Sequence, residues 1–281
     1  MTYQLSSLSK LVVQAEDLIK QPNANRLFIE VRLGTEPEEE HRKYRECHIF
    51  GAVYAQIRDV FASPPSATSG NLPLPSLTDL QAQLQRWSVD NHTEIILYGP
   101  SPALAARGGW VLRWAGLTNV KLLDGGLKSW VEAGGPVAQG DFTPKVKRGS
   151  STLALSEGNM PSITVSEVEK LSGEFILIDA RDEASFYSGR IPKAVNLPAS
   201  EQWSPSTRLR TIDEINTLYA RIGVKENAKI VVYCGGGVLS ALEVLTLQAL
   251  GKQAQLFVGS WSQWNKCPRR MALSDVQGEK I

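Results

Sequence analysis

A cysteine separates an apolar run from three glycines in the sequence IVVYCGGGVLSALEV, which spans residues 230–244. The β-branched and aromatic run that ends at Tyr233 is typical of a buried strand. Residues 241–250 favour a helix, and Gly251 is a natural stop for it. Cys234 is therefore expected at the carboxyl end of a strand, where α/β folds commonly place their chemistry. The turn from strand to helix consists of Gly235, Gly236, Gly237, Val238, Leu239 and Ser240.

This turn has the composition of a loop that holds an anionic sulfur. Glycine adopts positive φ at little cost, so successive backbone N–H groups can point toward one centre. In front of a helix N-terminus such N–H groups form an anion-binding nest, which the helix dipole reinforces. A cysteine at its centre would have a lowered pKa and be partly thiolate near neutral pH, and the nest would also stabilise a persulfide. We therefore favour a nucleophilic role for Cys234.

Two plainer interpretations of this stretch stand beside the nucleophile. Free cysteine is commonly buried, so Cys234 could act as a small apolar residue at a strand end, and the three glycines could form only a flexible turn. Glycines between a strong strand and a strong helix instead indicate close approach of the backbone to another group, and substrate is the favoured occupant. Cys47 and Cys267 have no comparable loop and are expected to be structural or incidental thiols.

The composition is that of an ordinary globular protein. The chain has 281 residues, 42% of them hydrophobic, and a formal net charge of +1, with no bias toward nucleic acid or a membrane surface. Its apolar runs are shorter than the roughly 18 residues that indicate a transmembrane helix, and the N-terminus has no signal-peptide pattern. Three cysteines without a disulfide spacing favour a reducing, cytoplasmic location.

The chain repeats one pattern in its two halves. EIILYGPSPALAARGGWVLRWAGL in the first half parallels KIVVYCGGGVLSALEVLTLQALG in the second, so that Gly99 stands where Cys234 does. Strands that alternate with helices at this spacing predict an α/β fold with a parallel sheet flanked by helices in each half. We expect a domain at 1–138 without the cysteine, a linker at 139–162 rich in Gly, Ser, Pro and charge, and a catalytic domain at 163–281.

Two features of the first half are expected to serve that half alone. Residues 61–76 are rich in Pro and Gly and are expected to form a surface excursion rather than a domain boundary. Arg107 and Arg113, on the predicted helix after Gly99, are expected to serve that domain's own packing and solubility.

Four motifs resemble those of the tandem-domain rhodanese family of sulfurtransferases. The resemblance implies two tandem rhodanese-like domains, the second catalytic and the first inactive because Gly99 replaces its cysteine. Within the family, the loop at Cys234 is most similar to that of 3-mercaptopyruvate sulfurtransferases. The motifs are HIFGAV (48–53), LLDGGLKSW (122–130), IDARDEASFYSGRIPKAVNLP (178–198) and CGGGVLSA (234–241).

The resemblance implies sulfur transfer through a Cys234 persulfide. Cys234 would take a sulfane sulfur from a small donor, 3-mercaptopyruvate or thiosulfate, and pass it to cyanide, a thiol or a protein cysteine in a ping-pong reaction. The backbone amides from Gly235 to Ser240 would hold the anionic sulfur, and no metal or organic cofactor is required. We expect an active site near the cleft between the domains, a monomer, and no nucleic-acid or membrane partner.

Two further residues are candidates for substrate contact. Arg190 occupies the position where the family motif usually has His; it could pair with an acidic side chain at the surface or bring positive charge toward a carboxylate substrate. His48 matches a first-domain histidine that joins a loop serine in a proton relay in mercaptopyruvate-type members. Gly236 takes the serine position here, so a structural role for His48 is favoured over one facing Cys234.

Arg181 is a third candidate, directly after the strand that opens the second domain. It could reach substrate, but an ion pair with Asp179 that orders the following turn is favoured. Glu30 and Arg32 repeat this pair in the half without the cysteine, so the pair does not depend on the chemistry of the loop.

Three other functions are weighed against the enzyme. A persulfide-relay protein would accept sulfur from a partner protein and show little turnover of small donors; it is favoured by the short segment 182–190, which lacks the substrate arginines of mercaptopyruvate-type members. Phosphatases that share the fold have Cys, five residues and Arg, but Ser240 takes the Arg position, so phosphate would lack its guanidinium clamp. A purely structural family member is disfavoured because Cys234 is retained.

Overall fold

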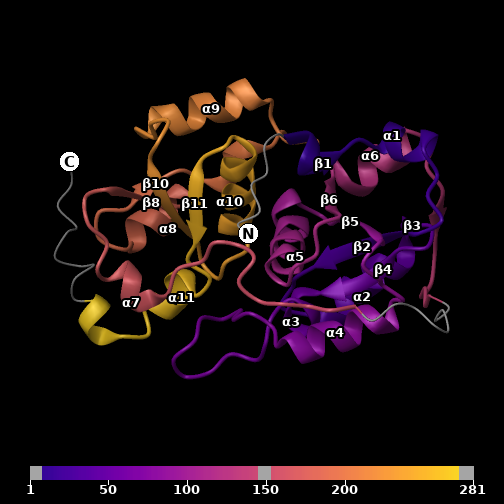
Figure 1. Cartoon of the computed structure of the whole chain (residues 1–281), viewed down its shortest axis with the longest axis horizontal. Helices are drawn as coiled ribbons and strands as arrows, with labels where there is room; N and C mark the ends of the chain where they lie inside the picture. The colour runs from indigo at the N-terminus through magenta and orange to yellow at the C-terminus, as the bar shows by residue number, and fades with distance from the viewer. Residues whose placement is uncertain (1–7, 145–152, 272–281) are drawn as a thin grey trace.

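Each half of the chain folds into a parallel sheet flanked by helices, and the two domains lie side by side (Figure 1). The structure is a computed structural model that describes residues 8–144 and 153–271. Residues 145–152, within the predicted linker, lie outside the described residues. The α/β fold class with two tandem domains is confirmed.

The first domain contains a sheet of five parallel strands in the order β1-β6-β5-β2-β4. A short antiparallel pair lies outside this sheet and consists of β3 (His48–Ile49) and β7 (Val137–Ala138). The strands of the main sheet are β1 (Val12–Val13), β2 (Arg26–Arg32), β4 (Val53–Gln56), β5 (Glu94–Tyr98) and β6 (Val120–Leu123).

The second domain contains four parallel strands in the order β11-β10-β8-β9, which matches β6-β5-β2-β4 strand for strand. Strand β10, which ends just before Cys234, therefore corresponds to β5, which ends just before Gly99. The duplication seen in the sequence is thus a duplication of the fold. The strands are β8 (Phe175–Asp179), β9 (Val195–Asn196), β10 (Lys229–Tyr233) and β11 (Gln253–Leu256).

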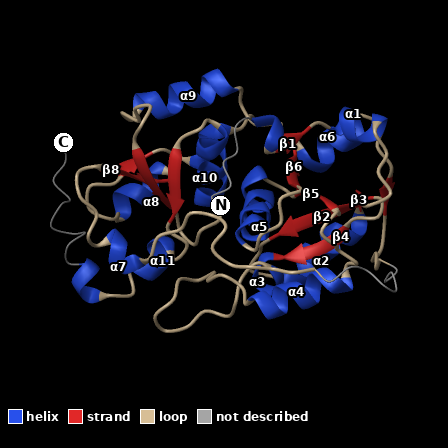
Figure 2. Cartoon of the chain, in the orientation of Figure 1, coloured by secondary structure: helices blue, strands red, loops and turns tan. Residues whose placement is uncertain are grey.

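Helices connect the parallel strands in both domains (Figure 2). The first domain has η1 (Leu8–Lys10), α1 (Ala15–Lys20), α2 (Pro37–Glu46), α3 (Ile57–Val60), α4 (Leu77–Arg86), α5 (Pro102–Trp114) and α6 (Gly126–Glu132). The second has α7 (Val165–Val168), α8 (Glu183–Ser188), η2 (Ala199–Gln202), α9 (Ile212–Arg221), α10 (Leu239–Ala249) and α11 (Ser260–Trp264).

The equivalent helices α5 and α10 pack against each other at the centre of the molecule (Figure 1). Trp110 and Leu112 of α5 are fully buried, as are Leu242 and Leu245 of α10, and all four belong to one apolar core that continues from one domain into the other. A helix that is apolar nearly all round must be covered on every side. The α5–α10 contact therefore holds the two domains together and brings first-domain side chains close to Cys234.

The stretch 61–76 leaves the first domain and runs along α11 of the second (Figure 2). The backbone N–H of Asn71 donates to Ser262 Oγ at 2.9 Å, and Gln263 Nε2 donates to the carbonyl of Thr68 at 2.8 Å. The predicted surface excursion holds for the exposed residues 64–68 but not for Phe61 and Leu72, which are buried in the core. Leu72 lies against Gly236 of the other domain, a contact that the sequence composition does not reveal.

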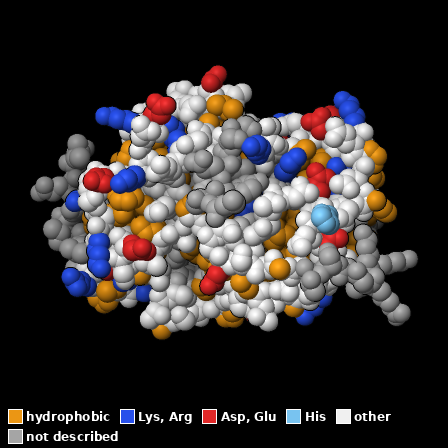
Figure 3. All heavy atoms as spheres, in the orientation of Figure 1, with side chains coloured by type: hydrophobic (Ala, Val, Ile, Leu, Met, Phe, Trp, Pro, Cys, Tyr) orange, Lys and Arg blue, Asp and Glu red, His pale blue; other side chains and the backbone are white. Residues whose placement is uncertain are grey.

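The surface shows no strong separation of charge on the face drawn in Figure 3, where acidic and basic side chains are interspersed. Nucleic-acid-binding proteins instead gather lysine and arginine on one face. Among the described helices, none combines the length and the apolar character needed to cross a bilayer.

Candidate active site

Cys234 follows β10 directly, as predicted, and its side chain is almost completely buried, with 1% exposure. Its Sγ accepts hydrogen bonds from the backbone N–H of Gly237 at 3.1 Å and from Ser240 Oγ at 3.3 Å. The backbone N–H of Cys234 donates to Ser260 Oγ at 3.2 Å. Two hydrogen-bond donors are thus directed at one sulfur atom.

The loop after Cys234 depends on glycine at one of its three positions. Gly237 has φ +81°, and a Cβ there would lie 2.7 Å from the carbonyl oxygen of Val258 and 3.0 Å from Arg107 Nη1. A Cβ at Gly235 would meet nothing within 4 Å, and one at Gly236 would approach only Leu72, at 3.6 Å. The close approach inferred from the glycines therefore occurs at Gly237, whose N–H contacts the sulfur.

Helix α10 begins at Leu239, two residues earlier than predicted, so Leu239 and Ser240 belong to its first turn instead of the loop. Leucine is a strong helix former, and Val238 takes the N-cap position. The early start places the Ser240 hydroxyl beside Cys234 Sγ. It also brings the positive end of the helix dipole close to the sulfur.

Arg107 of α5 reaches the loop from the first domain. Its guanidinium is fully buried and donates to the carbonyl oxygens of Gly237 at 3.3 Å, Phe61 at 3.1 Å and Leu72 at 2.9 Å. Burial lowers the pKa of Arg107 to about 10, and the nearby Cys234 opposes that shift. The predicted role of Arg107 in the packing of its own domain agrees with the bonds to Phe61 and Leu72. The predicted role in solubility is wrong, because the side chain is fully buried, and the bond to Gly237 of the second domain was not predicted.

Arg113, two turns further along α5, stays within its own domain. It is also buried and donates to the backbone carbonyls of Lys10 and Val120. Its predicted role in packing agrees with these contacts, while its burial leaves it no part in solubility.

Glu243 is a second buried charge-bearing residue near the sulfur, one turn after Ser240 on α10. It is fully buried, and its carboxyl oxygens make no hydrogen bond of normal geometry to a described residue, although Gln202 is close enough to lower its pKa slightly. Burial, followed by the charges of Cys234 and Asp179, raises the pKa of Glu243 well above its ordinary value. This shift favours the neutral acid form of the side chain. An acidic residue inside the apolar sequence VLSALEVLTLQAL is the signal that could have revealed it.

Arg181 is held by Asp179 in the structure. Its Nε lies 2.9 Å from Asp179 Oδ1 and its Nη2 lies 2.6 Å from the carbonyl oxygen of Gly189. The guanidinium also stacks over the ring of Trp261, 4.8 Å from its centroid. These contacts engage Nε and Nη2 of Arg181 within its own domain.

Arg190 and His48 have contacts away from the sulfur. The Arg190 guanidinium lies over the ring of Phe186 on α8, at 4.8 Å from its centroid. The His48 ring is buried in the first domain, stacked on Tyr44 at 4.1 Å between centroids, and its Nδ1 lies 3.0 Å from the Tyr44 carbonyl oxygen. The loop residues and Ser240 are thus brought together around Cys234, whereas these two side chains have other neighbours.

The stretch 61–76 covers the loop from the outside. Leu72 is 5% exposed and lies against Gly236. A Cβ on Gly70 would be 2.4 Å from the carbonyl oxygen of Gly259, so the two backbones are in direct contact. Because Cys234 is buried beneath this cover, a donor can reach the sulfur only after the cover or the loop moves.

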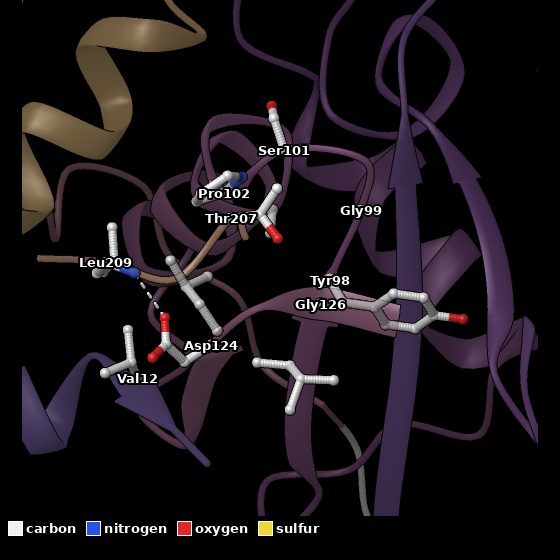
Figure 4. Close-up of a pocket in the computed structure, with 12 residues that line it drawn as sticks. Val12, Tyr98, Gly99, Ser101, Pro102, Asp124, Gly126, Thr207 and Leu209 are labelled. Atoms are coloured by element: carbon white, nitrogen blue, oxygen red, sulfur yellow. Dashed lines mark hydrogen bonds between the residues drawn. The ribbon is translucent and has the colours of Figure 1, made fainter. Parts of the chain in front are cut away.

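The first domain has the counterpart of this site at Gly99 (Figure 4). Thr207 and Leu209 of the second domain line the pocket there, and the N–H of Leu209 donates to Asp124 Oδ1 at 2.8 Å. A Cβ at Gly99 would lie 2.4 Å from the carbonyl oxygen of Val31. The position therefore has no room for a cysteine side chain unless the backbone shifts.

Comparisons with known proteins identify the family. The model of the rhodanese-like domain matches residues 12–133 and 164–267. SseB of Mycobacterium tuberculosis, assigned as a thiosulfate sulfurtransferase, is 32% identical over 256 residues, which cover 86% of this chain and 89% of that protein. The crystal structure of SseA from Escherichia coli, described as a 3-mercaptopyruvate sulfotransferase, has a TM-score of 0.77 and 26% identity, and the match covers 90% of this chain and 99% of that one.

The fold likeness extends to more distant proteins. The 3-mercaptopyruvate sulfurtransferase from Leishmania major has a TM-score of 0.82 at 18% identity, over 94% of this chain and 77% of that one. The chain belongs to the rhodanese family, as a tandem-domain sulfurtransferase. The predicted family and enzyme class are confirmed.

Proposed function

We propose that the protein moves sulfane sulfur through a persulfide on Cys234. The observation that carries this proposal is the pair of hydrogen-bond donors, Gly237 N–H and Ser240 Oγ, at 3.1 and 3.3 Å from Cys234 Sγ. Both donors point at the sulfur in the structure, so they are already placed where negative charge must be held.

The proposed reaction has two balanced steps. With thiosulfate, the Cys234 thiolate attacks the outer sulfur, the sulfur–sulfur bond of the donor breaks and sulfite leaves with the bonding electron pair. With 3-mercaptopyruvate, the carbon–sulfur bond breaks and the thiol proton is transferred to carbon, which gives pyruvate. Cyanide then attacks the outer sulfur of the persulfide, forms thiocyanate and returns the thiolate. The loop amides from Gly235 to Ser240 would hold the charge of the thiolate and that of the outer sulfur of the persulfide.

A small anionic donor is the proposed substrate class. Relatives of this chain carry the names of thiosulfate and 3-mercaptopyruvate sulfurtransferases. Residues 235–240 include no lysine or arginine, and Arg181 is engaged by Asp179. Loop amides, the Ser240 hydroxyl and the α10 dipole would therefore supply most of the positive potential at the sulfur. Arg190 and His48 would contribute to donor binding only after a rearrangement.

The division between domains belongs to this proposal. The second domain, 163–281, would be catalytic, and the first, 1–138, would be inactive, because Gly99 has no space for a cysteine side chain. Residues 139–162 would link them. Asn71 of the first domain bonds to the second domain, and Leu209 of the second domain bonds to the first. Because these contacts are made within one chain, they support a monomer. The three free cysteines support a reducing, cytoplasmic setting.

The test is steady-state sulfur transfer to cyanide from thiosulfate and from 3-mercaptopyruvate, read as thiocyanate. We expect turnover with at least one donor, loss of that turnover in Cys234→Ala, and no loss in the control Cys267→Ala. The ratio of kcat/KM values for the two donors identifies the preferred one. Turnover that survives in Cys234→Ala would contradict the proposal.

A further inference from the structure

Arg107 carries the buried positive charge that lies behind the catalytic loop. Its three hydrogen bonds all go to backbone carbonyls, and no carboxylate among the described residues lies within ion-pair distance of it. Two other buried arginines differ, since Arg32 pairs with Glu30 and Arg181 with Asp179. A fully buried cation without a paired anion is costly unless another negative group compensates it.

Among the described charged and ionisable groups near the sulfur, Cys234 is the one left to carry a negative charge that balances Arg107. Asp179 and Arg181 neutralise each other on the β8 side. Burial raises the pKa of Glu243 on α10 well above its ordinary value, which favours the neutral form of that carboxyl group. Residues 61–76, which cover the loop, include no charged side chain. With a neutral Cys234 thiol the buried region would hold the uncompensated charge of Arg107, whereas a thiolate or persulfide at Cys234 balances it.

Arg107 is also connected to the sulfur by structure. Its Nη1 donates to the carbonyl of Gly237, and the N–H of the same residue donates to Cys234 Sγ. The guanidinium therefore holds Gly237 in the conformation that directs its N–H at the sulfur. It joins this residue to Phe61 and Leu72, two buried residues of the covering stretch 61–76.

We propose that Arg107 is a positioning residue through which the first domain takes part in catalysis, as the counter-charge of the Cys234 thiolate and persulfide and as the anchor of Gly237. This inference rests on the proposed function, since it assigns the catalytic sulfur to Cys234. It gives the domain without a cysteine a defined chemical role. A guanidinium suits that role because it presents several donors in a fixed plane and keeps its charge when it is buried.

The test is the pKa of Cys234, measured from the ultraviolet absorbance of its thiolate during a pH titration, with Cys234→Ala as the blank. This readout needs neither turnover nor access of a reagent to the buried sulfur. We expect Arg107→Gln, which keeps an amide donor but loses the charge, to raise the pKa of Cys234 by about one unit or more. Arg107→Lys should give a value between those of wild type and Arg107→Gln, because a buried ammonium keeps part of the charge but cannot reach three carbonyls.

Arg113→Gln is the matched control, since Arg113 is a buried arginine of the same helix that donates to the carbonyls of Lys10 and Val120 in its own domain. It should leave the pKa of Cys234 unchanged. An unchanged pKa in folded Arg107→Gln, or an equal rise in Arg113→Gln, would overturn the inference. Should Arg107→Gln fail to fold, Arg107→Lys decides, and a wild-type pKa in it would also overturn the inference.

The titration separates this inference from the proposed function. Loss of the proposed function would appear as thiocyanate production that persists in Cys234→Ala, whatever the titration shows. A wild-type pKa in the Arg107 variants, with activity still dependent on Cys234, would refute only the role of Arg107.

Discussion

Replacing Gly237 by alanine tests whether the backbone of the loop is as tightly constrained as its contacts indicate. The residue has φ +81°, and the added Cβ would lie 2.7 Å from the Val258 carbonyl oxygen. The left-handed conformation costs a non-glycine residue about 1–2 kcal/mol, and overpacking adds about 1–3 kcal/mol, so Gly237→Ala should lower the free energy of unfolding by roughly 2–5 kcal/mol. Because the Val258 contact is to backbone, the cost cannot be relieved by rotating a side chain.

The same substitution should weaken catalysis, because the N–H of Gly237 donates to Cys234 Sγ. A rise of about one unit in the pKa of Cys234 corresponds to about 1.4 kcal/mol and would lower kcat/KM roughly tenfold below that pKa. The control is Gly235→Ala, where the new Cβ meets nothing within 4 Å; its unfolding free energy should stay within about 0.5 kcal/mol of wild type. Urea denaturation and thiocyanate production are measured for both variants. Equal stability of Gly237→Ala and Gly235→Ala would refute this reasoning.

Three further predictions concern the surroundings of the loop. Ser240→Ala removes one of the two donors to the sulfur and should lower kcat/KM about tenfold at neutral pH with little loss of stability; full activity would contradict it. Folded Glu243 keeps its proton above the ordinary carboxyl pKa while the unfolded chain releases it, so wild type should lose up to about 1.4 kcal/mol per pH unit relative to Glu243→Gln between pH 5 and 7. An equal pH dependence of the unfolding free energy in wild type and Glu243→Gln would show that Glu243 ionises in the folded protein. Gly70→Ala places a Cβ 2.4 Å from the Gly259 carbonyl oxygen and should speed hydrogen exchange across residues 66–71; unchanged exchange would show that this contact is not tight.

The strand, the loop and the duplicated fold could be predicted because their signals are local. The apolar run before Cys234 and the three glycines after it lie within a few residues of each other, and the pattern occurs twice in the chain. The sheet order then follows from the alternation of strands and helices. The sequence also shows that Gly99 replaces the cysteine in the first domain. The structure adds a reason, because a Cβ at position 99 would lie too close to the Val31 carbonyl oxygen.

The contribution of the first domain to the site could not be predicted in the same way. Arg107 looks like any helix arginine until α5 packs against α10, and 61–76 looks like a surface loop until it lies along α11. Contacts between domains join residues more than 100 positions apart, such as Arg107 and Gly237, and no local pattern marks them. The sequence places Ser240 in the loop, but the contact of its hydroxyl with Cys234 Sγ depends on where α10 begins.

The most direct measurement is a single turnover without acceptor. The protein is incubated with thiosulfate or 3-mercaptopyruvate, desalted, and digested under conditions that preserve persulfides, and the Cys234 peptide is weighed by mass spectrometry. We expect the mass of one added sulfur atom on the Cys234 peptide, no such gain on the peptides of Cys47 and Cys267, and loss of the added mass, with release of thiocyanate, when cyanide is supplied. An added sulfur on another cysteine, or thiocyanate formed while the Cys234 peptide never gains mass, would contradict sulfur transfer through Cys234.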